Sequence, residues 1–274
     1  MAPSFKNVDG LFATVDCVDW FDFRQRAHAF LTELPGKRRL SGDYLFRGQS
    51  CSSWPLIPSF DRENDTLSPV EADERYERMM AQFRNAFETY GDLSARGPSP
   101  LDAASPRPSD SELEALAQHH GLPTRLLDWS HSLYVAAFFA FSKVSDCSSG
   151  QVSVWALHTP ALKFFSEDHL AARLDPHKSN TRHVFQWGAF LRNKTGELNA
   201  DKKVDLVQIF RKGSRFYNSK HASGYPALIR FDIPQSAYDV AMDDLNAMRI
   251  NSMTIFPGID GVVQWIRTGG TVSR

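Results

Sequence analysis

Helical spacing of apolar side chains predicts helices of very different lengths along this chain. Apolar residues at three- and four-residue intervals predict a helix over residues 19–31, and Gly36 follows it as a stop signal. A long helix is predicted from Ser68 to Gly91, because Ser68 and Glu71 form a capping box ahead of a regular apolar stripe. A second capping pattern, Ser111-Glu-Leu-Glu114, predicts a shorter helix that Gly121 closes. Further helices are predicted over residues 133–142, 160–174, 235–248 and 258–267.

Short runs of alternating or β-branched residues predict strands between these helices. The predicted strands cover residues 43–49, 126–130, 151–157, 184–191, 204–210, 226–233 and 252–256. Strands and helices do not alternate regularly, as they would in a doubly wound sheet, and the sequence contains no internal repeat. The order therefore predicts an α+β fold with a mostly antiparallel sheet flanked by helices.

Proline and serine concentrate in residues 94–110, which predicts a mobile surface loop within one domain instead of a linker between two. The expected organisation is a helical extension over residues 1–39 followed by a single domain over residues 40–268.

Composition changes this picture in one respect. The 274 residues include 42% hydrophobic and 23% charged side chains with a net charge of -1, which excludes a disordered chain and a global attraction to nucleic acid. Residues 173–230 nevertheless carry twelve basic against four acidic side chains, interleaved with aromatic residues. This is typical of a surface that binds an anionic polymer, and it is equally typical of a solvated basic face. The candidate nucleic-acid contacts are Arg182, Arg192, Lys202, Lys203, Arg211, Lys212 and Arg215.

The three cysteines, Cys17, Cys51 and Cys147, are odd in number and far apart, so neither a disulfide framework nor a paired metal site is expected. A reducing, cytoplasmic setting fits this pattern. The first residues lack the features of a signal peptide, and no apolar run approaches the ~20 residues that span a bilayer.

Arg47 is a candidate anion-binding residue, because it lies at the end of a predicted strand next to Gly48 and close to Gln49. A guanidinium group in that position can bind a phosphate through two parallel hydrogen bonds, and the glycine would let a ligand approach the backbone. The alternative is a buried structural ion pair, with Asp128 as the partner.

Asp128 lies between Leu127 and Trp129, so its carboxylate must be paired or have a raised pKa. Pairing with Arg47 or Arg125 is the simpler interpretation. His119 and His120 are adjacent on a helix and point about 100° apart, so they cannot bind one metal ion together, and no metal is expected. One of them could act as an acid or base or orient a ribose hydroxyl, or it could simply bind a backbone carbonyl.

Several segments together resemble the FRG domain family, named for its Phe-Arg-Gly motif. The resemblance spans about residues 40–265, so the predicted domain is identified as an FRG domain. It rests on Leu45-Phe-Arg-Gly-Gln49, Ser53-Trp-Pro-Leu-Ile-Pro58, Ala117-Gln-His-His-Gly-Leu-Pro-Thr-Arg-Leu-Leu-Asp-Trp-Ser130, Ala136-Ala-Phe-Phe-Ala140, Gln186-Trp-Gly-Ala-Phe190 and Ile255-Phe-Pro-Gly-Ile-Asp-Gly261.

The opening motif is similar to the first motif of ADP-ribosyltransferases, which implies a split sheet and an arginine that grips the pyrophosphate of NAD. Arg47 matches that arginine. The resemblance implies that His119, Thr124 and Ser130, with Gln49, bind NAD as a substrate, and that Asp128 supplies negative charge or acts as a base. The family pattern places a glutamate in its third motif, whereas the matching segment here contains Gln186, which would lie near the acceptor. Asp128, Glu197 or Asp260 could supply the missing charge.

The resemblance implies an NAD-dependent ADP-ribosyltransferase, and the basic segment favours a nucleic-acid acceptor, RNA before DNA or protein. Such enzymes in bacteria often serve as toxins or antiviral effectors that an antitoxin or control protein restrains. Two other interpretations remain open. The chain could be a non-catalytic module that binds and senses a nucleotide or nucleic acid, or Arg47, Asp128 and Gln186 could form a buried network that only stabilises the fold.

Overall fold

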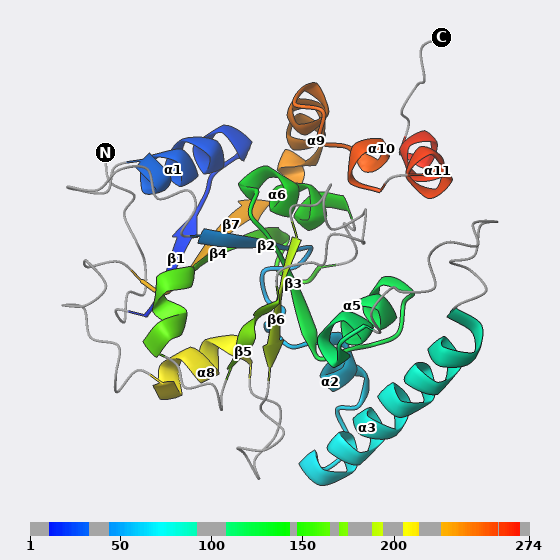
Figure 1. Ribbon diagram of the computed structural model, residues 1–274. Helices are drawn as coiled ribbons and strands as arrows, with labels where there is room; N and C mark the ends of the chain where they lie inside the picture. The colour runs from blue at the N-terminus through cyan, green and yellow to red at the C-terminus, as the bar shows by residue number, and fades with distance from the viewer. Residues whose placement is uncertain are drawn as a thin grey trace.

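The computed structural model describes residues 11–32, 44–91, 108–142, 147–164, 170–174, 188–193, 205–213, 226–256 and 258–268. These residues form an α+β fold in which helices flank an open, mixed sheet (Figure 1). The predicted Pro-rich loop at residues 94–110 lies almost entirely outside the described residues.

Seven strands of the described residues form one sheet in the order β1-β7-β4-β2-β3-β6-β5. The first and last strands of the chain, β1 and β7, are parallel, whereas the other neighbours are antiparallel. The strands are β1 (Phe12–Asp16), β2 (Tyr44–Gln49), β3 (Leu126–Ser130), β4 (Gln151–His158), β5 (Leu170–Leu174), β6 (Gly188–Asn193) and β7 (Leu228–Pro234).

Strand β1 was not predicted, and it changes the interpretation of the N-terminal segment. Phe12 pairs with Leu228 and Asp16 with Asp232, so this segment contributes a strand to the sheet as well as a helix. It is therefore not a purely helical extension.

The helices cover both sides of the sheet and one end of it (Figure 1). They are α1 (Trp20–Thr32), α2 (Ser59–Glu63), α3 (Pro69–Ala86), η2 (Phe87–Gly91), α5 (Asp110–His119), α6 (Leu133–Ser142), η3 (Thr159–Phe164), α8 (Leu206–Gly213), η5 (Gln235–Ala237), α9 (Tyr238–Ala247), α10 (Ser252–Ile255) and α11 (Ile259–Arg267).

Three predicted elements have the wrong type or extent. Residues 160–174 form the short helix η3 and strand β5, and not one helix. Residues 204–210 and 252–256, predicted as strands, contain helices α8 and α10. Short apolar runs fit both periodicities, and tertiary contacts decide between them.

The two capping predictions have different outcomes. The box of Ser68 and Glu71 at the start of α3 is confirmed. Helix α5 begins two residues earlier than predicted, because Ser109 and Glu112, and not Ser111 and Glu114, form its capping box. Glu114, predicted as a capping residue, is buried and accepts a hydrogen bond from the hydroxyl of Tyr76.

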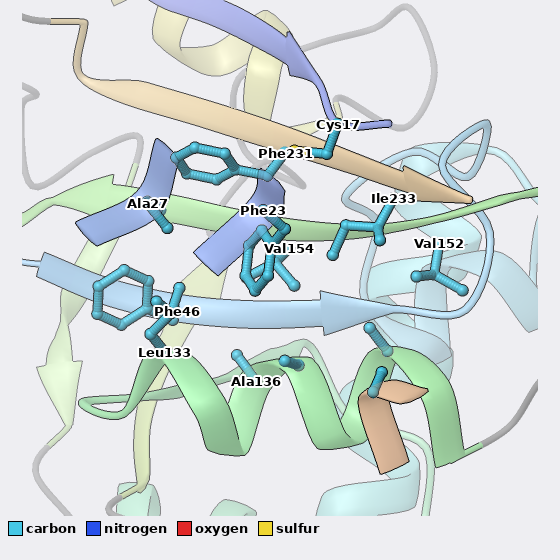
Figure 2. Packing of buried hydrophobic residues seen from close by; sticks show 14 of the residues in the cluster. Cys17, Phe23, Ala27, Phe46, Leu133, Ala136, Val152, Val154, Phe231 and Ile233 are labelled. Carbon is cyan, nitrogen blue, oxygen red and sulfur yellow. The ribbon is translucent and has the colours of Figure 1, made fainter. Parts of the chain in front are cut away.

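The main core lies between one face of the sheet and the helices α1, α6 and α9. Figure 2 shows Phe46 of β2, Val154 of β4 and Phe231 of β7 facing Phe23 of α1 and the helix α6. A second core covers the opposite face beneath α8, and a third, smaller one joins α2, α3 and α5.

Gly48 lets α6 pack directly on β2. A Cβ atom at this position would lie 2.0 Å from the carbonyl oxygen of Ala136 and 2.5 Å from the amide nitrogen of Ala140. Both atoms belong to the backbone of α6, so no side-chain movement can relieve the overlap. The absence of a side chain at Gly48 therefore lets α6 pack against β2. Because the Cα of Gly48 faces this helix, it does not provide the expected approach of a ligand to the backbone.

Cys51 and Cys147 form a disulfide bond, with their Cα atoms 5.3 Å apart. The expectation that the cysteines do not pair is therefore wrong, and the cysteine argument for a reducing, cytoplasmic setting is lost. Within the described residues, no helix has the length and apolar character needed to cross a bilayer.

Candidate functional site

A cavity of about 450 Å³ opens where β2 and β3 separate. Phe46 and Ser130 are the register pair that joins these two strands, and the residues beyond that pair line the cavity. Its volume falls within the ~300–1,000 Å³ of small-molecule sites. The lining includes strand, helix and loop residues: Phe46, Arg47, Gly48, Gln49, Ser50, Trp54, Arg62, Ala115, Gln118, His119, Asp128, Trp129, Ser130, Ala136, Phe139, Ser142, Phe190 and Phe256.

The guanidinium group of Arg47 lies at the mouth of this strand junction. Its Nη1 donates a 2.7 Å hydrogen bond to the backbone carbonyl of Asp128 and lies 4.0 Å from the Asp128 carboxylate. Burial lowers the pKa of Arg47; the carboxylate of Asp128 opposes this shift, and the positive charge of Arg62 adds to it. Arg47 is thus the basic neighbour of Asp128, whereas Arg125 pairs with Asp61 and Asp73.

Asp128 is held at the cavity by a short hydrogen-bond network. The hydroxyl of Thr124 donates to the side-chain oxygen of Gln118, and the amide of Gln118 donates to the Asp128 carboxylate. The side chain of Asp128 is 63% exposed, so its carboxylate is accessible from the cavity. Thr124 is fully buried, so it positions Gln118 and does not contact the cavity.

Ser130 and His119 both line the cavity, at the end of β3 and the end of α5. The Ser130 hydroxyl is buried and accepts a hydrogen bond from the amide of Ser132. Ser132 in turn accepts from the amide of Val135 in the first turn of α6, so Ser132 is the serine that caps this helix.

Both polar groups of the Gln49 side chain form hydrogen bonds within the fold. Its amide donates to the carbonyl of Pro55, and its oxygen accepts from the indole of Trp155 at 2.6 Å. These bonds tie the loop after β2 to the sheet. The predicted role of the Gln49 side chain in binding NAD would require both to break.

Residues 42–148 match the family model of the FRG domain. The chain carries an FRG domain. No curated protein and no solved structure matches the chain. Of the residues that line the cavity, Phe190 and Phe256 alone fall outside the matched segment, so the FRG domain itself builds most of the site.

The three residues that name the FRG domain have three different physical roles here. Phe46 is buried in the main core, Arg47 faces the cavity, and Gly48 contacts α6. The motif therefore places a core contact, a cavity-lining side chain and a helix contact in consecutive positions of one strand.

Arg62 and Trp54 line the cavity and were not among the predicted site residues. Arg62 belongs to α2, a five-residue helix whose N-cap, Pro58, makes no side-chain hydrogen bond. Trp54 is 47% exposed on the loop after β2. A helix this short and uncapped gives no periodic signal, whereas the exposed tryptophan in a Pro-rich loop could have drawn attention to this wall.

Arg125 stabilises the FRG domain away from the cavity. It pairs with Asp61 and Asp73 and stacks on the rings of Phe60 and Tyr76. These contacts link α2 and α3 to the start of β3, so this arginine belongs to the scaffold.

The predicted nucleic-acid contacts cannot be placed. Four of these contacts lie outside the described residues: Arg182, Lys202, Lys203 and Arg215. Gln186, expected near the acceptor, and Glu197, considered as a source of negative charge, also lie outside them. Arg192 belongs to β6 and Arg211 and Lys212 belong to α8, but their side chains are not described. Asp260 belongs to α11 and does not line the cavity.

Proposed function

We propose that the protein is an NAD-dependent ADP-ribosyltransferase whose substrate binds in the cavity between β2 and β3. The observation that carries this proposal is the convergence of Arg47, His119, Asp128 and Ser130 on one cavity of about 450 Å³. These residues come from three separate segments. Arg47 matches the arginine of the resemblance, Asp128 and Ser130 belong to the strand that it implies, and His119 is our own assignment.

The donors of the cavity suit an anionic ligand. Nε of Arg47 and Nε1 of Trp129 are buried and have no hydrogen-bond partner within the described structure. An unsatisfied buried donor costs about 1–3 kcal/mol, which an acceptor atom of a ligand would recover. Arg47 also presents a planar group that matches a phosphate in two hydrogen bonds. We therefore expect Arg47 to hold the pyrophosphate of NAD, with Ser130 and His119 beside the ribose and nicotinamide.

NAD supplies an activated ribosyl group, because the bond from its ribose C1′ to nicotinamide breaks with the electron pair leaving on nicotinamide. Positive charge then develops at C1′, and a nearby carboxylate stabilises such a centre. Asp128 is the acidic residue among the described lining residues, which favours it over Asp260 of α11. The partly exposed carboxylate can also accept the proton of the nucleophile that bonds to C1′.

The acceptor that we propose is RNA, and this step rests on the charge of residues 173–230. Arg230 is excluded as a contact, because its guanidinium group binds Asp232 and the carbonyl of Ser52. An enzyme that modifies RNA would harm its own cell. We therefore propose a toxin or phage-defence role, with an antitoxin or control protein as partner.

A non-catalytic nucleotide-binding role is the second candidate, and one observation favours it. One oxygen of Asp128 accepts from Gln118, and the other lies 4.0 Å from Arg47, so part of its negative charge is already offset. In that case the protein would bind NAD or a related nucleotide without breaking it.

Incubation with NAD labelled on the adenylate half, separately with RNA, DNA and cell protein, tests these proposals. We expect nicotinamide release and transfer of label to RNA, reduced at least about 100-fold in Arg47→Ala and Asp128→Asn. Arg78→Ala is the matched control, because Arg78 is an exposed helix residue paired only with Glu74 among the described residues. If a variant has the same Tm as the wild type and turns over NAD at an unchanged rate, the role assigned to its mutated residue is refuted. Binding of intact NAD without nicotinamide release would instead favour the binding module.

A further inference from the structure

Arg62 places a second positive charge in the same cavity. It lies on α2, its side chain is exposed, and its Nη1 donates a 2.7 Å hydrogen bond to the carbonyl of Ile57. This bond anchors one corner of the guanidinium group. Among the described residues, no carboxylate lies within ion-pair distance of Arg62, so its charge is not offset locally.

The two guanidinium groups act on each other. The charge of Arg62 lowers the pKa of Arg47, in the same direction as burial does. Two like charges that share one cavity repel each other, and an anion bound between them removes the repulsion. The carboxylate of Asp128 offsets the positive charge of Arg47 but not that of Arg62, because it lies beside the Arg47 guanidinium group.

The two arginines lie at different depths. The side chain of Arg47 is 16% exposed at the end of β2, whereas Arg62 is exposed on the short helix that forms the rim. A single phosphate bound by Arg47 would leave the positive charge of Arg62 at the rim without an anionic partner from the ligand. A ligand with two linked phosphates could place one at each depth.

We propose that Arg62 is a second phosphate-binding residue, and that Arg47 and Arg62 together select ligands with two linked phosphates over ligands with one. This inference rests on the proposed function, since the pyrophosphate of NAD would be such a ligand. Each arginine would bind one phosphate, Arg47 the inner and Arg62 the outer.

The test compares the affinities of ADP-ribose and AMP, with inorganic pyrophosphate as a probe that lacks the nucleoside. Arg62→Gln removes the charge but keeps an amide that can donate to the Ile57 carbonyl. A charge-assisted hydrogen bond contributes about 1.5–3 kcal/mol, so we expect Arg62→Gln to weaken ADP-ribose and pyrophosphate by about 10–100-fold. Affinity for AMP should change by less than about threefold, because its one phosphate binds at Arg47.

Two controls separate this inference from folding and from the proposed function. Arg84→Ala removes an exposed arginine on α3 that pairs with Asp110, and it should leave all three affinities unchanged. Melting curves show whether Arg62→Gln is folded, and Arg62→Lys, which keeps the charge, should recover part of the lost affinity for pyrophosphate.

The outcomes are distinct. Equal losses for AMP and ADP-ribose would overturn the selection for two phosphates, and unchanged affinities in a folded Arg62→Gln would overturn the role of Arg62. If wild type releases nicotinamide in either case, the transferase proposal still stands. If wild type binds pyrophosphate through Arg62 but never cleaves NAD, the phosphate site stands and the transferase proposal fails.

Discussion

Burial determines the charge state of Asp232, a single carboxylate in the middle of the sheet. Asp232 is 3% exposed on β7, where it pairs in register with Asp16 of β1 and binds Arg230. Loss of water raises its pKa from 3.8 to about 6, because desolvation outweighs the attraction of Arg230, and Asp16 adds to the rise.

We predict that ionisation of the Asp232 carboxylate lowers the free energy of unfolding as the pH rises. The folded state holds the proton of Asp232 more tightly than the unfolded state, so its contribution to stability is full below about pH 4 and is lost as the pH rises through about 6. Asp232→Asn does not titrate. Its free energy of unfolding relative to wild type should therefore rise on the order of 3 kcal/mol between pH 4 and pH 7.

Denaturant unfolding of both proteins at several pH values measures this difference, with Asp239→Asn on the exposed side of α9 as the baseline. The loss of the Arg230 partner shifts the Asp232→Asn curve by a constant and leaves its slope unaffected. A constant difference across this range would mean that Asp232 stays charged at low cost.

Single residues of the site could be predicted where a motif carried them. Arg47 was selected for its place at a strand end and Asp128 as a carboxylate between apolar residues, and both line the cavity. Arg62 escaped notice because only the packing of α2 beside β2 brings it there. Thr124 and Gln49 were selected for their polarity, but their hydrogen bonds go to Gln118, Pro55 and Trp155, which sequence does not reveal.

At the scale of elements, the contact between α6 and β2 sets the geometry of the cavity wall. Ala136 and Ala140 are one helical turn apart, and both meet the strand at Gly48. Small residues on both elements allow this close approach, and Ala136 itself lines the cavity beside Arg47. Figure 2 shows Ala136 on the side of α6 that faces β2.

We predict that Gly48→Ala separates α6 from β2 at a cost of about 2–3 kcal/mol or more, because overpacking against backbone cannot be relieved by rotamer changes. Thermal unfolding measures the loss. Gly150→Ala is the matched control, since a Cβ there meets nothing within 4 Å and only the positive φ of 64° opposes it, at roughly 1–2 kcal/mol. If Gly48→Ala costs no more than Gly150→Ala, the helix is not held at this point.

Elements with strong local signals could be predicted, and those fixed by distant partners could not. Helix α3 has its own capping box, proline and apolar stripe. Strand β1 depends on β7, more than two hundred residues away in the chain, and so gives no recognisable local pattern. Helix α8 buries Leu206, Val207 and Phe210, a short apolar run that reads equally well as a strand.

At the scale of the whole molecule, the loop after β2 connects the cavity with β7, β4 and the segment before α8. The loop after β2 carries Trp54 at the cavity, and its neighbour Ser52 accepts from Arg230 and donates to Gln151. Further along, the amide of Leu56 donates to Asp205 just before α8. The disulfide from Cys51 to Cys147 joins this loop to the residues that precede β4.

We predict that the disulfide contributes about 2–4 kcal/mol to the free energy of unfolding, because it closes a long loop in the unfolded chain, with its two cysteines 96 positions apart in sequence. Cys51→Ser should therefore lower Tm by several degrees under non-reducing conditions, and a reductant should lower the wild type to a similar value. Cys17→Ala, which alters the free buried cysteine, should remain sensitive to reductant.

Thiol titration of the denatured protein provides the decisive count. One reactive thiol before reduction and three after it would match the bond between Cys51 and Cys147, whereas three thiols at the start would contradict it. The same variant links stability to the site, because Cys51 follows directly on Gln49 and Ser50 of the cavity wall. Loss of the disulfide should weaken ligand binding through the loop that carries Trp54, while the hydrogen bond from Arg47 to Asp128 stays intact.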